Sequence, residues 1–227
     1  MALDLIILGG LAAGMVHVLS GPDHLAAIAP LAADSSRTHW KTGFSWGVGH
    51  TSGVLVVGVL ALLLKEVLPL EAISSWSERL VGVALVAVGA WGAHRAMATR
   101  VHIHEHTHGG ASHAHVHVHA TGRQHDAPRP HAHAHTHTSF GFGILHGLAG
   151  SSHVLGILPA LALPTRAASA AYLAAYGVGN IAAMTVFAAI MGALAVRAEL
   201  AGRRLYQGLL TACSVAAIVV GAFWLLA

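Results

Sequence analysis

The order of apolar and polar residues divides the chain into six apolar stretches. Each is near the ~20 residues that a helix needs to cross the hydrocarbon core of a bilayer. Helices are the expected form, because an open sheet edge leaves backbone groups without partners in lipid. A Gly-Pro pair interrupts the first stretch, and glycines interrupt the fourth. The predicted spans run approximately over Leu3–Ala33, Phe44–Leu64, Leu80–Met97, Phe140–Leu163, Ala167–Val196 and Leu205–Ala227.

The composition agrees with a protein made mostly of such spans. Apolar residues form 55% of the chain and charged residues 9%, whereas soluble domains average about 25% charged residues. We therefore expect an all-α polytopic membrane protein. The apolar N-terminus has no Lys or Arg ahead of it, so we interpret it as the start of the first span and not as a secretory signal. The single cysteine, Cys213, provides no disulfide framework.

A histidine-rich segment separates the third and fourth apolar stretches. Residues 100–138 contain thirteen histidines, mostly in the pattern His-x-His. This composition cannot build a packed core, so we expect a disordered loop, and such tracts are typical of metal binding. The predicted domains are a first repeat at 1–99, this loop at 100–138 and a second repeat at 139–227. The auxiliary metal-binding candidates in the loop are His102, His104, His106, His108, His113, His115, His117, His119, His131, His133, His135 and His137.

The two halves of the chain share a sequence pattern that indicates an internal repeat. At an offset of 129 residues, His17 and His24 align with His146 and His153. Each half contains three spans, and an odd number places the second half upside down relative to the first. Inverted repeats with broken helices are the architecture of many secondary transporters. The other aligned segments are Gly21 with Gly150, Pro30 with Pro159 and, at an offset of 130, Gly47-Val48-Gly49-His50 with Gly177-Val178-Gly179-Asn180.

The basic residues predict the orientation in the membrane. The connections after spans one, three and five, with their flanks, carry nine of the twelve Lys and Arg residues, and the other side carries only Lys65, Arg79 and Arg166. By the positive-inside rule the richer side is cytoplasmic. We therefore expect a multi-pass protein of the cell (inner) membrane, with the histidine-rich loop in the cytoplasm and both termini outside. The formal net charge is only +3, without a basic stripe interleaved with aromatics, so no nucleic-acid partner is expected.

The strongest candidate chemistry lies in the interrupted first span. His17, Asp23 and His24 are polar groups within apolar sequence, where they are costly and usually functional. Imidazoles with one carboxylate suit Ni²⁺, Co²⁺, Cu²⁺ or Zn²⁺ better than Mg²⁺ or Ca²⁺. Asp23 either offsets part of the ion's charge or orients a histidine. The further metal candidates are His50, His146 and His153, and the residues expected to support the ligands are Asn180 and Ser152.

Two other histidines fit a simpler interpretation. His94 lies at the end of a span beside Arg95, and His39 lies in a connection. A single histidine at such a place is more often a hydrogen-bond partner between helices than a metal ligand. We therefore leave both outside the candidate site.

At these residues the chain resembles the nickel/cobalt transporter (NicO) superfamily. Its signature is a histidine, four or five residues, then Asp-His, and here His17 is followed by five residues and Asp23-His24. The segments Trp46–Thr51 and Leu145–Gly150 resemble further segments of the family. The resemblance is greatest to the six-span branch, which includes urease-associated nickel permeases and nickel/cobalt efflux proteins. The eight-span branch has the four-residue spacer, which this chain lacks. The resemblance implies transport of Ni²⁺ or Co²⁺ and implicates His17, Asp23 and His24 in metal recognition.

The leading hypothesis is therefore a transporter of divalent transition-metal ions, most of all Ni²⁺ and secondarily Co²⁺, by alternating access at a midplane His/Asp site. The ion is the substrate, no resident cofactor is expected, and the partners are the lipid bilayer and a cytoplasmic metallochaperone. One alternative is a membrane protein that senses or stores metal with its histidine-rich loop. The less favoured alternative is an intramembrane metalloenzyme, because no His-Glu-x-x-His motif occurs. Direction of transport, coupling ion and oligomeric state stay open.

Overall fold

The computed structural model describes residues 3–34, 39–64, 70–108, 111–120, 133–149 and 152–226. This part of the chain contains eight helices and one two-stranded sheet. The helical fold class is thus as expected for the body of the protein. The elements are α1 Leu3–Ser20, α2 Pro22–Asp34, α3 His39–Leu64, α4 Leu70–Ala98, β1 Thr99–His108, β2 Ala111–Ala120, α5 His133–Leu148, α6 Ser152–Leu161, α7 Arg166–Ala201 and α8 Arg203–Leu226.

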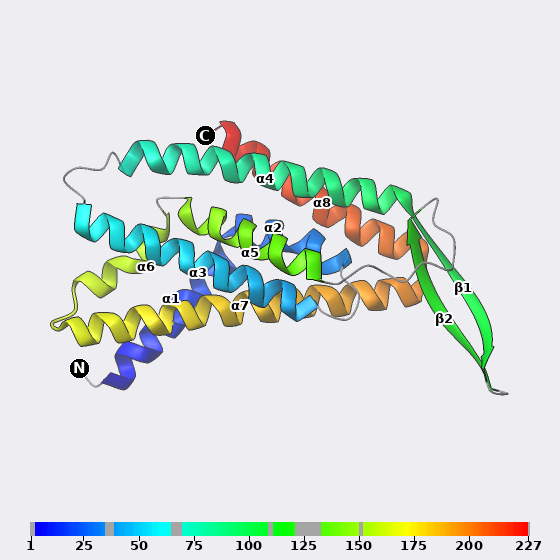
Figure 1. Ribbon diagram of the computed structural model, residues 1–227, viewed down its shortest axis with the longest axis horizontal. Coiled ribbons are helices and arrows are strands. Elements are labelled where there is room, and N and C mark those ends of the chain that lie inside the picture. Colours follow the sequence, from blue (N-terminus) through cyan, green and yellow to red (C-terminus); the bar gives the residue numbers. More distant parts are fainter. Residues whose placement is uncertain are drawn as a thin grey trace.

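The helices pack largely as three long pairs (Figure 1). Helix α4 lies along α8, α1 lies against α7, and α3 lies against α5 and also contacts α7. The short helix α2 sits among α3, α4, α7 and α8. Both termini lie toward one end of the bundle and the β1–β2 hairpin projects from the other (Figure 1).

Four helices are long and apolar enough to cross a membrane. By length and composition they are Leu3–Ser20, Glu78–Ala98, Arg166–Ala201 and Arg203–Leu226, within the part of the chain that the structure describes. They coincide with the first part of span one and with spans three, five and six of the sequence prediction. Helices α5 and α6 have 16 and 10 residues, which is short of about 20 for each alone. The count of six spans therefore stays a prediction.

The outer faces of α7 and α8 carry large apolar side chains. Val186 and Ile190 on α7 are 58% and 52% exposed, and Val219 and Phe223 on α8 are 61% and 70% exposed. A soluble protein rarely leaves so much contiguous apolar surface in water. These faces are therefore compatible with contact with lipid.

The first predicted span is divided into two helices, as its sequence indicates. Helix α1 ends at Ser20, Gly21 is not helical, and α2 begins at Pro22. Proline suits the first position of a helix, because the N–H that it lacks would have no partner within the helix. The amide of His24 donates to the carbonyl of Gly21 over 3.1 Å and closes the first turn of α2. The fourth predicted span is likewise two helices, α5 and α6.

The structure differs from the sequence prediction in the histidine-rich segment. We expected a disordered loop over 100–138, but β1 and β2 pair as an antiparallel hairpin, and α5 already begins at His133. The register places His102 opposite His117 and His104 opposite His115. The physical reason lies in the alternation itself: it has the two-residue period of a strand, and many of the intervening residues are Val, Ile or Thr, which favour strands.

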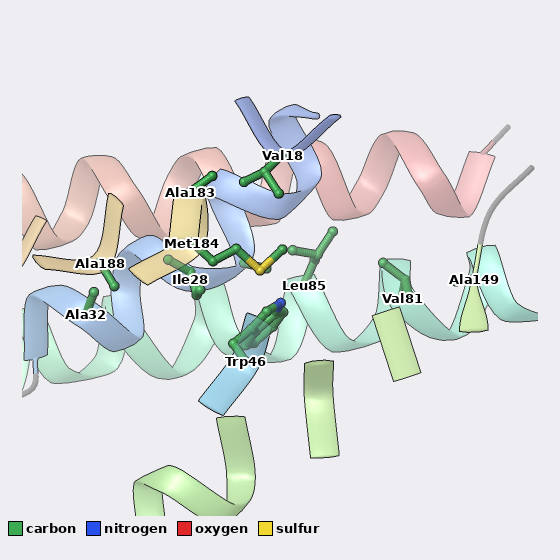
Figure 2. Close-up of a cluster of buried hydrophobic side chains, with 11 residues drawn as sticks. Val18, Ile28, Ala32, Trp46, Val81, Leu85, Ala149, Ala183, Met184 and Ala188 are labelled. Carbon is green, nitrogen blue, oxygen red and sulfur yellow. The ribbon is translucent and has the colours of Figure 1, made fainter. Parts of the chain in front are cut away.

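The main buried core lies where α1, α2, α3, α4 and α7 meet. Figure 2 shows the side chain of Met184 between Ile28 and Leu85, with Trp46 beside them. These residues are almost fully buried, and Val18 at the end of α1 belongs to the same cluster. The core therefore holds the α1–α2 break in place from one side.

Candidate metal centre

Five polar side chains from four helices meet at the break between α1 and α2. They are His17 from α1, Asp23 and His24 from α2, His50 from α3 and His146 from α5. His50, His24, His146 and Asp23 are 0%, 2%, 3% and 5% exposed, and His17 is partly buried. The structure therefore brings together residues that are up to 129 positions apart in the sequence.

The helix break determines how these groups face one another. Pro22 starts α2, so Asp23 lies in its first turn, where a carboxylate interacts favourably with the positive end of the helix dipole. A Cβ atom on Gly21 would lie 2.8 Å from Oδ1 of Asp23 and 2.9 Å from Cε1 of His24. Real Cβ atoms do not approach other atoms this closely. The absence of a side chain at Gly21 thus leaves room for the two polar groups that follow it.

Asp23 uses both of its carboxylate oxygens. Nδ1 of His24 donates a hydrogen bond to Oδ1 over 2.9 Å, because an ionised carboxylate can only accept. Nε2 of His146 lies 3.2 Å from Oδ2. One carboxylate therefore bridges two imidazoles that belong to different helices, α2 and α5.

The ring of His24 is at the centre of the cluster. Its centroid lies 4.7 Å from that of His17, 4.8 Å from that of His50 and 4.6 Å from that of His146. The planes of the His17, His50 and His146 rings make angles of 82°, 81° and 79° with the plane of the His24 ring. The rings of His17 and His50 are nearly parallel to each other, 5.7 Å apart with an angle of 18°.

Two sets of three residues have ligand atoms close enough to hold a metal ion. One set is His17, His24 and His50, and the other is Asp23, His24 and His146, each with its atoms within 4.8 Å of one another. Nitrogen donors with a single carboxylate are typical of Ni²⁺, Co²⁺, Cu²⁺ and Zn²⁺ sites. The donor set is therefore compatible with the class of ion that the sequence predicts.

For most of the other predicted site residues the structure describes no side chain. His153 and Ser152 belong to α6, but the structure does not describe their side chains. Asn180 is on α7 and completely buried. His131 lies outside the described residues, and His137 is exposed on α5. For the remaining loop histidines the structure describes only the backbone, so their role in metal binding stays a prediction; these are His102, His104, His106, His108, His113, His115, His117, His119, His133 and His135.

The two histidines left outside the site lie away from it. Nδ1 of His39 donates to the carbonyl oxygen of Ala32 over 3.0 Å, as expected for a hydrogen-bond partner between helices. His94 is exposed near the end of α4. His94 therefore offers a matched control for substitutions within the cluster.

Two aromatic residues beside the cluster were not among the predicted site residues. Tyr176 on α7 is 2% exposed, with its ring 5.8 Å from that of His17, and Trp46 on α3 lies 6.2 Å from the ring of His146. The repeat contains the missing signal, because the offset of 130 that aligns His50 with Asn180 also aligns Trp46 with Tyr176. Both aromatics flank the cluster and reduce its contact with water.

Comparisons with known proteins give three similarities. The chain is 35% identical over 213 residues to Chloroplast protein FOR GROWTH AND FERTILITY 1 of Arabidopsis thaliana, covering 93% of this chain and 56% of that protein. FOR GROWTH AND FERTILITY 2 of the same plant is 34% identical over 213 residues, with 93% and 54% covered. Urease accessory protein UreH of Bacillus sp. (strain TB-90) is 29% identical over 189 residues, with 81% and 74% covered.

The chain thus spans about half the length of the two chloroplast relatives and about three quarters of UreH. No family model matches the chain, and no solved structure matches it. The similarity to a urease accessory protein is distant. It agrees with the resemblance to the family of urease-associated permeases that the His-x5-Asp-His segment indicates.

Proposed function

We propose that the chain is a membrane transporter of divalent transition-metal ions, with Ni²⁺ as the first candidate and Co²⁺ as the second. The observation that carries this proposal is the buried cluster of four imidazoles and one carboxylate at a helix break among apolar helices. Ionisable groups at such places usually mark an ion pathway. The distant similarity to urease accessory protein UreH supports the same function, since the family that the sequence resembles includes nickel permeases.

The cluster can replace the water that a divalent ion loses on leaving solution. Neutral imidazoles supply nitrogen donors without charge, and Asp23 supplies one negative charge against the two positive charges of the ion. In a low-dielectric interior an unpaired ion is strongly disfavoured, so this partial neutralisation lowers the barrier to entry. A site with more carboxylates would hold the ion more strongly and release it more slowly.

Close contacts between the helices support the proposed inverted repeat. A Cβ on Gly47 would lie 2.9 Å from Cα of Ile181, and a Cβ on Gly177 would lie 2.7 Å from Cγ2 of Thr51. At the offset of 130, Gly47 aligns with Gly177 and Thr51 aligns with Ile181. The contact of Gly47 with Ile181 therefore has its counterpart in the contact of Gly177 with Thr51, with the roles of α3 and α7 exchanged. The crossing of α3 and α7 is therefore self-complementary, as a two-fold relation between the halves requires.

A second pair of contacts is related in the same way, with Gly14 aligned to Gly143 at the offset of 129 and His50 aligned to Asn180 at the offset of 130. A Cβ on Gly14 would lie 3.0 Å from the amide nitrogen of Asn180, and a Cβ on Gly143 would lie 3.0 Å from that of His50. The contact of α1 with α7 thus has its counterpart in the contact of α5 with α3. Two broken helices, α1–α2 and α5–α6, then face each other across the site, which is the arrangement in which alternating access is expected.

In this proposal the chain crosses the cell (inner) membrane six times. The end of the bundle with the hairpin lies in the cytoplasm, and the end with both termini lies outside. Figure 1 shows the hairpin and the termini toward opposite ends of the bundle. The histidine-rich segment would then hold metal at the cytoplasmic mouth and exchange it with a metallochaperone. The chain carries out transport and not catalysis, and the names of its three relatives describe no enzyme.

A second candidate function is sensing or storage of metal by residues 100–138, which the thirteen histidines favour. Deletion of this segment separates the two functions. Flux that persists with altered affinity supports transport through the cluster. Loss of every response to metal, with no flux by the full chain, supports sensing.

The direct test of transport is Ni²⁺ flux into proteoliposomes. We expect the full chain to transport Ni²⁺ and a His17→Ala, Asp23→Ala double variant to lose flux, because the variant removes one imidazole and the only carboxylate of the cluster. His94→Ala is the matched control, since it removes an exposed imidazole outside the site. Undiminished flux in the double variant would exclude the cluster as the transport site.

A further inference from the structure

The cluster contains two sets of ligand atoms that overlap at a single residue. His24 belongs both to the imidazole set, with His17 and His50, and to the carboxylate set, with Asp23 and His146. Each set has three ligand atoms within 4.8 Å of one another. The geometry therefore gives an ion two neighbouring positions and one ligand that serves both.

The two nitrogens of His24 serve different positions. Nδ1 is 2.9 Å from Oδ1 of Asp23 and so faces the carboxylate set. The two ring nitrogens of an imidazole point away from opposite edges of the ring. Nε2 is therefore the atom that His24 can offer to the imidazole set, whose other rings meet His24 at steep angles.

In the carboxylate position each oxygen of Asp23 has one imidazole nitrogen nearby. Nδ1 of His24 lies 2.9 Å from Oδ1, and Nε2 of His146 lies 3.2 Å from Oδ2. Ligand atoms at right angles around an ion, with bonds of about 2.1 Å, lie about 3 Å apart. Right-angled coordination is that of tetragonal Ni²⁺ and Cu²⁺ sites.

The positions also differ in charge and in burial. The carboxylate position carries one negative charge and the imidazole position carries none. Attraction in a low-dielectric interior therefore favours the ion at Asp23. Among the five residues of the cluster His17 is the least buried, and it belongs to the imidazole set. The imidazole position is thus the one nearer to the route by which an ion enters or leaves.

We infer that one ion at a time alternates between these two positions, a weak imidazole position and a stronger carboxylate position, with His24 as the shared ligand. This inference rests on the proposed transport function.

Equilibrium binding to the purified full chain in detergent tests this inference without measuring flux. Co²⁺ is the probe, its stoichiometry is measured by elemental analysis, and its imidazole ligands are counted by X-ray absorption. His50→Gln disables the imidazole position, His146→Gln disables the carboxylate position, and His94→Gln is the control. Glutamine keeps much of the side-chain volume, and circular dichroism with size-exclusion chromatography verifies folding.

We expect the wild type to bind one Co²⁺ per chain. His146→Gln should weaken this binding by at least about tenfold, and His50→Gln should weaken it by a smaller factor. The ion left in His146→Gln should have three imidazole ligands, and the double variant should bind none. Two ions bound at once to the wild type, or equal losses in the two single variants, would overturn the two-position arrangement. Failure of the wild type to transport metal in proteoliposomes would refute transport itself and leave these binding results unaffected.

Discussion

An ion pair holds the far end of the helix that carries Asp23 and His24. Nε of Arg95 donates to Oδ1 of Asp34 over 3.1 Å, and Nη2 donates to Oδ2 over 3.0 Å. The side chain of Asp34 is 7% exposed and that of Arg95 is 32% exposed. The pair joins the last residue of α2 to the last turn of α4, so it fixes the position of α2 in the bundle.

The substitution Arg95→Gln should destabilise the fold by leaving the carboxylate of Asp34 buried without its cation. Breaking a fully buried pair in this way costs about 3–5 kcal/mol, and an exposed pair contributes about 0–1 kcal/mol. Because Arg95 is one third exposed, we expect an intermediate loss of about 2 kcal/mol. For a soluble domain of this size that corresponds to a fall in Tm of about 4–8 °C.

Thermal unfolding in detergent, followed by circular dichroism, measures this loss. The matched variant is Asp34→Asn with Arg95→Gln, which removes both charges and should recover about half or more of the lost stability. Residues in direct contact are expected to show such coupling, whereas independent residues give additive losses. If the double variant were destabilised by the sum of the two single variants, the pair would not anchor α2.

Two glycine positions give further predictions. Gly21→Ala should lower the affinity for Co²⁺ with little effect on Tm, because its Cβ would meet Asp23 and His24. Isothermal titration measures the affinity. Gly9→Ala is the control, because a Cβ there meets nothing within 4 Å. An unchanged affinity would contradict the role of the break. Gly82→Ala should lower Tm, because its Cβ would lie 2.9 Å from the carbonyl oxygen of Gly221 and separate α4 from α8. Gly208→Ala on α8, where a Cβ has open space, should leave Tm nearly unchanged, and equal shifts would refute this packing argument.

The parts of the fold that depend on local chemistry were predictable. Proline breaks a helix whatever surrounds it, so the division of span one at Gly21-Pro22 followed from the sequence. The repeat indicated that His146 could meet the residues of the first half, and His50 was a further candidate, but the sequence did not predict the geometry of the cluster. The bridging of two imidazoles by Asp23 depends on where α5 lies against α3, which no local pattern determines. The same holds for Asp34 and Arg95, which are 61 residues apart.

The hairpin shows where compositional reasoning fails. A segment rich in histidine and poor in large apolar residues has too little to bury, which argues for disorder. Composition ignores order, however, and the strict alternation in 101–108 has the period of a strand. Tyr176 was missed for a related reason: attention to metal-binding residue types leaves out the aromatic groups that surround them.

In the proposed repeat the scaffold occurs twice but the metal-binding chemistry occurs mainly once. The glycine contacts of α1 with α7 and of α5 with α3 are equivalent, yet His50 corresponds to Asn180 and Asp23 to Ser152. Among the described residues His146 is the second half's contribution to the cluster. A symmetric site would carry two carboxylates, which would bind a divalent ion more strongly and slow its release. In the proposed transport cycle, one carboxylate shared between α2 and α5 would let either half move away with only part of the ligand set, so that the ion could leave.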